Sequence, residues 1–314
     1  MNLNFASIWE EISDIIPDRT AMICGTEKKT WFEYDEAASK LASALNDSGL
    51  KTYSKAGLYL HNSNEYLEAQ FAIFKIGGTP INVNYRYKAD ELLYLLDNSD
   101  CEALFYQACY GDQINLIKNK LPKIKAWIEV DDGSHSEVAE SLNYYQLLKD
   151  CEPMQRWERP EDIVYMLYTG GTTGMPKGVM YNQAEFITGM FKTVKAMGYL
   201  VPDDMNNLTE YVKDLDAKNE LPVNLVGCPL MHGTGMWLGC FLPHNLGGTV
   251  VTIPGLGFDP DKIWNECSRS HVTNIIIVGD AFARPMLDAL NNAKNMNNPY
   301  NLSSLQQITS SGVM

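Results

Sequence analysis

Short apolar runs alternate with amphipathic stretches along most of this chain, and this alternation limits what it can fold into. The later runs read IKAWIEV, DIVYMLYT, NLVGCPL, GGTVVTI and VTNIIIVG. Several are continuously apolar, which is typical of parallel strands that helices cover on both faces. The pattern therefore predicts an α/β architecture of layered parallel or mixed sheets covered by helices.

The stretches between the runs have helical spacing. In WFEYDEAASKLASALNDSG, one face carries Tyr34, Ala37, Ala38, Leu41 and Leu45. Gly49 follows as a favourable residue for ending that helix. A second helix, EYLEAQFAIFKI, is expected after Asn64, whose side chain suits a helix N-cap. The sequence also predicts a helix in KADELLYLLDNSD and strands in AGLYLHN, TPINVN and CEALFYQ.

Charge and cysteine content narrow the class of protein. The 25 Lys and Arg residues against 39 Asp and Glu give a net charge of −14, so we expect no general surface for nucleic acid or anionic lipid. The seven cysteines include no CxxC pair, and their number is odd, which favours a reducing, cytoplasmic location. We expect neither a signal peptide nor an integral membrane span, because no apolar run approaches about 20 residues.

A polar, proline-bearing region separates two halves of the pattern. It runs from Asp131 to Arg159 and contains DDGSHSE and CEPMQRWERP. We therefore predict a first α/β subdomain at residues 1–158 and a second at residues 159–314.

The stretch YTGGTTGMPKGVMY, residues 168–181, follows a predicted buried strand directly. Glycine-rich loops with hydroxyl groups and a lysine can hold phosphates through backbone N–H groups and one full positive charge. The loop is not a P-loop of the Walker type, because Pro176 precedes Lys177 and Gly178 follows it. We expect an irregular loop at residues 168–178 that leaves the carboxyl end of a parallel strand, where open sheets bind ligands, and a further strand GVMYN. A simple tight turn is the alternative.

The loop resembles the phosphate-binding signature of the adenylate-forming enzymes, Tyr-Thr-Ser-Gly-Thr-Thr-Gly-x-Pro-Lys-Gly. This superfamily comprises acyl-CoA synthetases, firefly luciferases and peptide-synthetase adenylation domains. The chain departs at one position, where Gly170 replaces the serine. Three other segments resemble the superfamily in the right order, namely FKIGGTPINVNYRYKADELLYLLDNSDCEALF, PLMHGTGMW and TSSGVM. On these motifs the chain is identified as a member, matching the N-terminal portion of such enzymes.

The resemblance implies a two-step reaction. A carboxylate attacks the α-phosphate of ATP to give an acyl-adenylate and pyrophosphate, and the thiol of CoA then displaces AMP. ATP, Mg²⁺ and CoA are thus implied, together with a carboxylic acid. The phosphate-binding residues would be Thr169, Gly170, Gly171, Thr172, Thr173, Gly174 and Lys177. Thr169 is also a candidate Mg²⁺ ligand, and the adenine-binding residues would be Ser311, Gly312 and Val313.

His232 and Lys177 are the residues to which the resemblance assigns catalytic roles. His232 would lie near the carboxylate and the α-phosphate, where its imidazole donates to an oxygen and gates the acyl tunnel. It is not expected to be a general base, because a carboxylate nucleophile needs none. A packed or hydrogen-bonded structural histidine is the alternative.

The acyl pocket is assigned by the same resemblance to Gly233, Met236, Trp237 and Asp280. The glycines at 233, 235 and 239 would leave room beside Trp237 and Phe241 for a sizeable apolar acid. A core role fits the two aromatic residues equally well.

Asp280 has two interpretations. The form GDAFARP resembles the branch of acyl-CoA synthetases associated with long-chain and steroid side-chain acids, where this residue would contact the substrate. Alternatively, Asp280 caps the helix AFARPMLDAL. The insertion at residues 203–220 is expected to form a solvated helix or a lid.

Several later parts of the superfamily pattern have no counterpart in the 314 residues. They are the Tyr-Gly-x-Thr-Glu segment that helps to hold Mg²⁺, the ribose-binding aspartate, the hinge and the C-terminal subdomain with its lysine. We therefore expect little turnover from this chain alone, with a C-terminal half or a homodimer partner supplying the rest. A non-catalytic nucleotide-binding or regulatory protein is the alternative.

Overall fold

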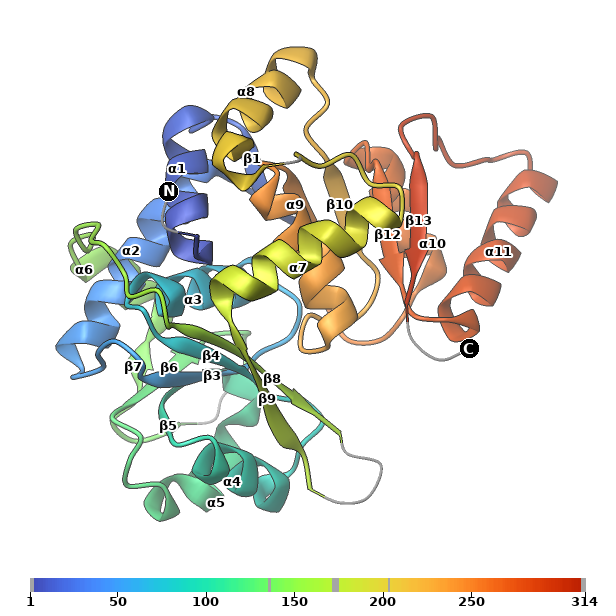
Figure 1. Ribbon diagram of the computed structural model, residues 1–314. Helices are drawn as coiled ribbons and strands as arrows, with labels where there is room; N and C mark the ends of the chain where they lie inside the picture. The colour runs from blue at the N-terminus through green and yellow to red at the C-terminus, as the bar shows by residue number, and fades with distance from the viewer. Residues whose placement is uncertain (1–2, 135–136, 171–174, 203, 312–314) are drawn as a thin grey trace. The chain divides into compact units, whose positions relative to one another are not determined.

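Figure 1 shows the computed structural model, which describes residues 3–134, 137–170, 175–202 and 204–311. The chain divides into two compact units that are interleaved in sequence. The first contains the residues up to Ile8, Glu33–His61 and Glu65–Ile187. The second contains Trp9–Phe32, Asn62–Asn64 and the residues from Thr188 onward. These bounds differ from the subdomains expected on either side of residue 158, and that division stays a prediction about domains.

The first unit contains a five-stranded sheet in the order β4-β3-β5-β6-β7. All of its neighbouring strands pair in parallel. The strands are β3 (Lys55–Tyr59), β4 (Thr79–Asn82), β5 (Cys101–Gln107), β6 (Ala126–Val130) and β7 (Leu142–Asn143). Four of them fall in runs that the sequence pattern predicts as strands, so these predictions are confirmed.

Helices and short turns connect these strands. They are α3 (Asn64–Lys75), α4 (Ala89–Asn98), η1 (Ala108–Tyr110), α5 (Gly111–Ile117), η2 (Lys118–Lys120) and α6 (Tyr144–Asp150). At the start of α4, the Lys88 N–H donates to the Glu91 carboxylate over 3.1 Å, which satisfies one open backbone donor. The same helix buries Leu92, Leu95 and Leu96 in the core of the unit.

Strands β8 (Val164–Thr169) and β9 (Lys177–Asn182) form a separate antiparallel hairpin in the first unit. Both strands are predicted correctly from the sequence. The expectation that β8 is a parallel strand is wrong. A loop of seven residues joins β8 to β9, which allows only an antiparallel return, since parallel pairing needs a long crossover. A buried apolar run is compatible with either pairing, so the run alone could not decide.

The second unit contains a six-stranded mixed sheet in the order β13-β12-β10-β11-β1-β2. Only β1 and β2 pair in antiparallel fashion, and the other neighbours are parallel. The strands are β1 (Thr20–Cys24), β2 (Glu27–Thr30), β10 (Val223–Val226), β11 (Thr249–Thr252), β12 (Asn274–Ile277) and β13 (Gln307–Ser310). Parallel and mixed sheets flanked by helices match the predicted fold class.

The second unit also contains helices between its strands. They are η3 (Met205–Asn207), α8 (Leu208–Lys218), the π-helix η4 (Thr234–Phe241), α9 (Leu242–Asn245), α10 (Pro260–Arg269) and α11 (Asp280–Asn295). In the core of this unit, the buried Trp264 ring donates its N–H to the Met286 carbonyl over 2.8 Å. The expected helix in the 203–220 insertion is confirmed as α8, which buries Leu208 and Val212. A lid role for this helix stays a prediction.

Three further helices each contain one of the points at which the chain passes from one unit to the other. They are α1 (Phe5–Ile15), α2 (Trp31–Asp47) and α7 (Gln183–Ala196). The predicted apolar face of α2 is buried along its whole length, and Gly49 follows it with φ of +87°. This backbone conformation favours glycine, as the sequence analysis expects.

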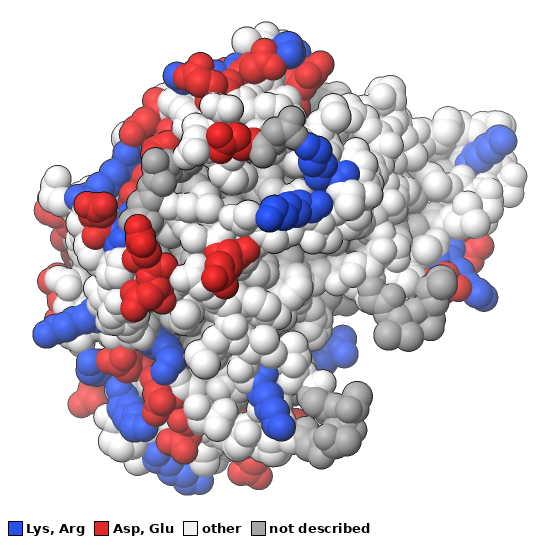
Figure 2. Space-filling model, in the orientation of Figure 1, with Lys and Arg blue, Asp and Glu red and all other residues white. Residues whose placement is uncertain are grey.

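Two further properties of the described part of the chain concern membrane spans and surface charge. No helix within it is both long enough and apolar enough to cross a membrane. On the face shown in Figure 2, Lys and Arg side chains are scattered among Asp and Glu side chains and make no continuous basic patch there.

Candidate active site

The open end of the β8–β9 hairpin carries part of the predicted phosphate site. Thr169 ends β8 and pairs with Lys177, which begins β9. Both residues are exposed, and so is Gly170. Four of the predicted residues, Gly171, Thr172, Thr173 and Gly174, lie outside the described residues. The structure thus places a hydroxyl and an ammonium group opposite each other, accessible to a ligand.

The glycines of this hairpin differ in what they permit. A Cβ added at Gly170 would meet no atom within 4 Å, so the missing serine side chain has room. A Cβ at Gly178 would lie 2.8 Å from the Met166 sulfur and from the Tyr168 ring. Gly178 is therefore required for packing between the two strands, whereas Gly170 is not.

The second unit brings the other predicted segments to one edge of its sheet. Strands β10, β12 and β13 are parallel neighbours, so the residues that follow them meet at their carboxyl ends. The Ser311 N–H donates to the Ile277 carbonyl over 3.2 Å, and the Gly279 N–H donates to the Ser310 hydroxyl over 2.9 Å. The predicted adenine residue Ser311 therefore lies beside the start of α11. Gly312 and Val313 lie outside the described residues.

His232 lies in the turn between β10 and the π-helix, and the residue is exposed. Its backbone N–H donates to the Pro229 carbonyl over 3.2 Å. The preceding segment is held by Asn62, which donates to the Cys228 carbonyl over 3.0 Å and accepts from the Leu230 N–H over 2.8 Å. The exposure of the residue does not fit burial in a core. Its roles as a ligand contact or as a hydrogen-bonded structural group both stay predictions.

The predicted acyl-pocket segment forms the π-helix, a rare geometry that occurs often at functional sites. Met236 is buried in it, and Trp237 and Gly233 are half-buried. A Cβ at Gly235 would approach the Pro229 carbonyl oxygen to 2.3 Å, and one at Gly239 would approach Val226 to 2.9 Å. The expectation that these two glycines make room for an acid is wrong, because they let the π-helix pack against its own unit.

The two aromatic residues of this helix differ in exposure. Phe241 is fully buried and belongs to the core. Trp237 keeps part of its surface exposed, so it stays a candidate for contact with a substrate.

Asp280 does not cap α11, which corrects one of its two interpretations. The capping position is Gly279, with φ of +61°, and Asp280 is the first residue of the helix. Its carboxylate accepts from the Arg284 side chain over 2.9 and 3.1 Å. The side chain remains 55% exposed, so contact with a substrate is still open to it.

A buried histidine behind the π-helix was not singled out by the sequence. His244 is completely buried, and its Nε2–H donates to the Ala21 carbonyl over 3.1 Å. Burial lowers the pKa of His244 to about 3, which keeps the ring neutral. The ring lies against the edges of Trp9 and Trp31, so we regard it as a structural group.

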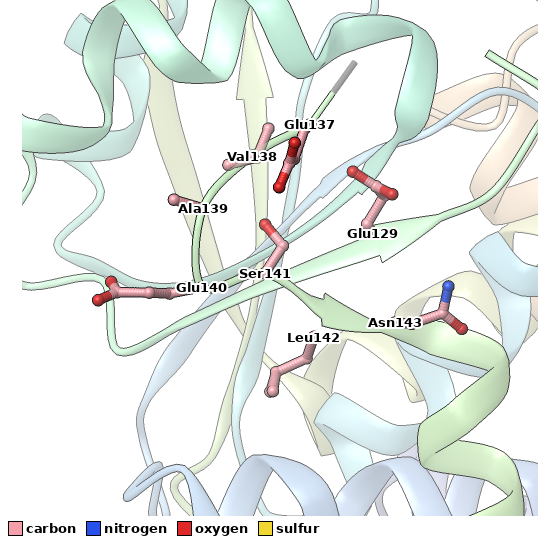
Figure 3. Close-up of a pocket in the computed structure, with 8 residues that line it drawn as sticks. All are labelled: Glu129, Glu137, Val138, Ala139, Glu140, Ser141, Leu142 and Asn143. Atoms are coloured by element: carbon pink, nitrogen blue, oxygen red, sulfur yellow. The ribbon is translucent and has the colours of Figure 1, made fainter. Parts of the chain in front are cut away.

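The first unit contains a pocket of about 280 Å³. The residues that line it do not belong to the β8–β9 hairpin, and several of them are acidic. Its residues are Glu129, Glu137, Val138, Ala139, Glu140, Ser141, Leu142 and Asn143. Figure 3 shows the carboxylates of Glu129 and Glu137 near the Ser141 hydroxyl, while that of Glu140 points away. Two carboxylates on one side disfavour a polyanion such as ATP.

Metal-ligating side chains and cysteines are the remaining candidates for chemistry among the described residues. Within this part of the chain, no group of three or more His, Cys, Asp or Glu side chains could hold a metal ion. The exposed Thr169 hydroxyl is the one described oxygen that the sequence analysis assigns to Mg²⁺. None of the seven cysteines is in a disulfide.

Comparison with known proteins identifies the class. The family described as "AMP-binding enzyme" matches residues 10–313, and the chain belongs to this family. The membership predicted from the motifs is therefore confirmed.

Two curated relatives and one solved structure show which members it is similar to. A medium/long-chain-fatty-acid–CoA/3-oxocholest-4-en-26-oate–CoA ligase of Mycolicibacterium smegmatis is 35% identical, over 100% of this chain and 56% of the relative. A 3-oxocholest-4-en-26-oate–CoA ligase of Rhodococcus rhodochrous is 34% identical, with the same coverage of 100% and 56%. The N-terminal domain of FACL13 from Mycobacterium tuberculosis has a TM-score of 0.77 at 18% identity, covering 99% of this chain and 70% of that domain. The chain thus spans about half the length of these curated relatives and has the fold of a ligase N-terminal domain.

Proposed function

We propose that this chain is the acid-activating portion of an AMP-forming acyl-CoA synthetase. In the complete enzyme it would join a carboxylic acid to ATP to give acyl-AMP, which then passes to CoA. The observation that carries the proposal is the exposed Thr169–Lys177 pair in a chain of the AMP-binding family. Because the chain spans 56% of its relatives, we propose that turnover needs the remaining length of a ligase, joined to it or supplied by a partner.

The hairpin residues are assigned to the β- and γ-phosphates. Attack of a carboxylate on ATP brings negative charges together, so the transition state needs positive charge that is already in place. Lys177 supplies a full charge through its exposed ammonium group, and the Thr169 hydroxyl donates one hydrogen bond. Both contacts retain the pyrophosphate while it leaves.

Mg²⁺ fits this arrangement only in part. Bound with ATP, it would neutralise phosphate charge, and Thr169 could offer one hydroxyl oxygen to it. Phosphate oxygens and water are the usual further ligands of such an ion. The described residues supply no acidic cluster for it, so no step is assigned to the metal here.

The carboxyl edge of the second sheet is assigned to the acid and the adenine. Ser311 would contact the adenine, and the exposed His232 ring would donate to a carboxylate or α-phosphate oxygen. Met236, Trp237, Gly233 and Asp280 would border the acyl chain. The names of the relatives support a long-chain or steroid side-chain acid as the substrate.

A nucleotide-binding protein without catalysis is the second candidate. It would need only the proposed phosphate contacts of Thr169 and Lys177, and no bound acid. The seven cysteines form no disulfide, which supports the proposed cytoplasmic location for either function.

Binding and exchange measurements separate these candidates. Titration calorimetry would measure ATP and pyrophosphate binding to the 314-residue chain, with and without Mg²⁺. ATP–pyrophosphate exchange would then be measured with short, long-chain and steroidal acids, for the chain alone and mixed with the unmatched C-terminal portion of the Mycolicibacterium relative. We expect binding by the chain alone and acid-dependent exchange only in the mixture.

Each other outcome is decisive. Exchange by the chain alone would contradict the proposal that turnover needs the remaining length of a ligase. Binding without exchange in the mixture would favour the non-catalytic candidate. Absence of both ATP and pyrophosphate binding would overturn the proposed function.

A further inference from the structure

We propose that Asn82 and Tyr94 are positioning residues that hold the two ends of the hairpin loop and thereby set the places of Thr169 and Lys177. Neither residue is among those assigned above to ATP, metal or acid. The inference rests on the proposed phosphate role of the hairpin. Its basis is a set of hydrogen bonds within the first unit.

Asn82 binds the backbone of the residue that precedes Thr169. Its side-chain amide donates to the Tyr168 carbonyl over 3.1 Å and accepts from the Tyr168 N–H over 2.7 Å. An asparagine amide has the same donor and acceptor as a peptide group, so this pair of bonds imitates a neighbouring strand. Asn82 ends β4, and Figure 1 shows β8 passing beside that strand.

A second bond from β4 shows that this attachment extends along the strand. The Thr79 hydroxyl donates to the Val164 carbonyl over 3.3 Å. Val164 and Tyr168 are four positions apart in the strand. Because backbone groups alternate in direction from one residue to the next, those of Val164 and Tyr168 face the same side of β8. Side chains of β4 therefore replace the strand ladder that β8 lacks on that side.

The alternation of backbone direction explains how Asn82 acts on the next residue. In an antiparallel pair, successive residues direct their N–H and C=O groups to opposite sides. Tyr168 directs both groups to Asn82, so Thr169 directs its groups towards Lys177. Fixing Tyr168 thus fixes the last pair of the hairpin.

Helix α4 holds both ends of the loop. The Tyr94 hydroxyl donates to the Pro176 carbonyl over 3.3 Å, next to Lys177. The Tyr168 hydroxyl donates to Asn98 over 2.9 Å. Tyr94 and Asn98 are four residues apart and share one face of the helix, so a single helical turn contacts the residues before Thr169 and Lys177.

Position matters here because the phosphate contacts are electrostatic and directional. Charge-assisted hydrogen bonds weaken when the donor moves away, and a displacement of about 1 Å can cost about 100-fold in a catalytic step. The anchors bond backbone atoms of Tyr168 and Pro176, so the proposed effect on the ligand is indirect.

The experiment measures pyrophosphate and ATP binding to the 314-residue chain by titration calorimetry. Asn82→Ala removes both bonds to Tyr168, and Tyr94→Phe removes one hydroxyl while keeping the ring. We expect dissociation constants to rise about tenfold for Asn82→Ala and about threefold for Tyr94→Phe, because losing two bonds or one lowers the fraction of the chain that holds Thr169 and Lys177 in the binding position. Matched controls are Asn115→Ala and Tyr145→Phe, whose side chains bond Glu137 and Glu65 in the same unit.

Combination with Thr169→Val and Lys177→Ala separates positioning from general loss of structure. If the anchors act through these two residues, adding either anchor substitution to the Thr169→Val/Lys177→Ala variant should weaken pyrophosphate binding by no more than about twofold. If Asn82→Ala does not fold, the test rests on Tyr94→Phe, because this substitution keeps the aromatic ring and its packing.

The outcomes are distinguishable. If the wild-type chain binds pyrophosphate and ATP and both anchor variants bind them equally well, the inference is overturned but the proposed function is not. Fully additive losses in the Thr169→Val/Lys177→Ala background, or equal losses in the control variants, would also overturn it. A wild-type chain that binds neither ligand would overturn the proposed function, and this inference with it.

Discussion

Thr169 lies directly opposite Lys177, where β8 ends and β9 begins. The pairing is a property of the antiparallel register and would shift with any slip between the strands. Gly178 resists such a slip, because only glycine fits against Met166 and Tyr168 at the next position. The hairpin thus sets which hydroxyl-bearing and which ammonium-bearing residue lie opposite each other, and a phosphate contact shared by the two is the proposal made above.

Replacing Lys177 with Ala should weaken pyrophosphate and ATP binding about tenfold or more, since a hydrogen bond to a charged group contributes about 1.5–3 kcal/mol. Lys177 is exposed, so the free energy of unfolding should change little. Titration calorimetry and thermal unfolding would check both expectations, with the exposed Lys149→Ala as the control.

The same variant gives a sharper test when the remaining length of a ligase is present. Adenylate formation should slow, whereas thioester formation from supplied acyl-adenylate should stay nearly intact, because pyrophosphate has already left. Equal slowing of the two half-reactions would contradict a phosphate role.

Gly170→Ser and Gly178→Ser form a matched pair. The first side chain enters open space, so folding should be unaffected and the added hydroxyl should tighten pyrophosphate binding by about 0.5–1.5 kcal/mol. The second overpacks the hairpin and should cost about 1–3 kcal/mol of unfolding free energy. Urea unfolding and calorimetry measure these effects. Unchanged affinity in Gly170→Ser would mean that backbone amides suffice at this position.

Local patterns predicted the elements of this fold better than their partners. The apolar runs at β3, β5 and β12 and the buried face of α2 follow from spacing and composition, which each segment carries by itself. The antiparallel pairing of β8 and the place of β1 between β11 and β2 depend on contacts with distant segments. No pattern within either segment contains that information.

The candidate site shows the same division. The signature around Lys177 is visible because it is contiguous in sequence. Asn82 and Tyr94 lie more than 70 residues earlier, in a strand and a helix with ordinary composition, so only the fold reveals their bonds to Tyr168 and Pro176. The roles of Gly235 and Gly239 were misread because a glycine does not reveal whether it makes room for a ligand or for its own chain.

Trp237→Ala should shift the preference of the complete ligase towards bulkier acids while leaving ATP affinity nearly unchanged. The half-buried ring would be removed from the acyl end alone, and contacts of this kind are worth about 10–200-fold in selectivity. Competition assays with a panel of acids would measure the change. Phe241→Leu is the comparison, because Phe241 is fully buried. An unchanged ranking of acids in Trp237→Ala would assign Trp237 to the core as well.

Asp280→Asn removes one charge and the ion pair with Arg284. Both side chains of this pair are more than half exposed, so the free energy of unfolding should change by less than about 1 kcal/mol. Arg284→Gln breaks the same pair and leaves the carboxylate. If Asp280 borders the acyl tunnel, only Asp280→Asn should alter acid selectivity in competition assays. Equal effects of the two variants would assign Asp280 to the helix alone.

The buried His244 should make the second unit less stable in mild acid. Burial lowers its pKa from 6.5 to about 3, so the unfolded chain binds a proton that the folded chain does not bind between these values. Stability from this group is present above pH 6.5 and is lost as the pH falls, by about 1.4 kcal/mol for each unit once the unfolded imidazole is protonated. Between pH 7 and pH 5 the loss should be about 2 kcal/mol. Urea unfolding at several pH values would measure this slope, which His244→Gln should reduce and the exposed-site control His271→Asn should not. Equal slopes in wild type and His244→Gln would show that other groups control the acid sensitivity.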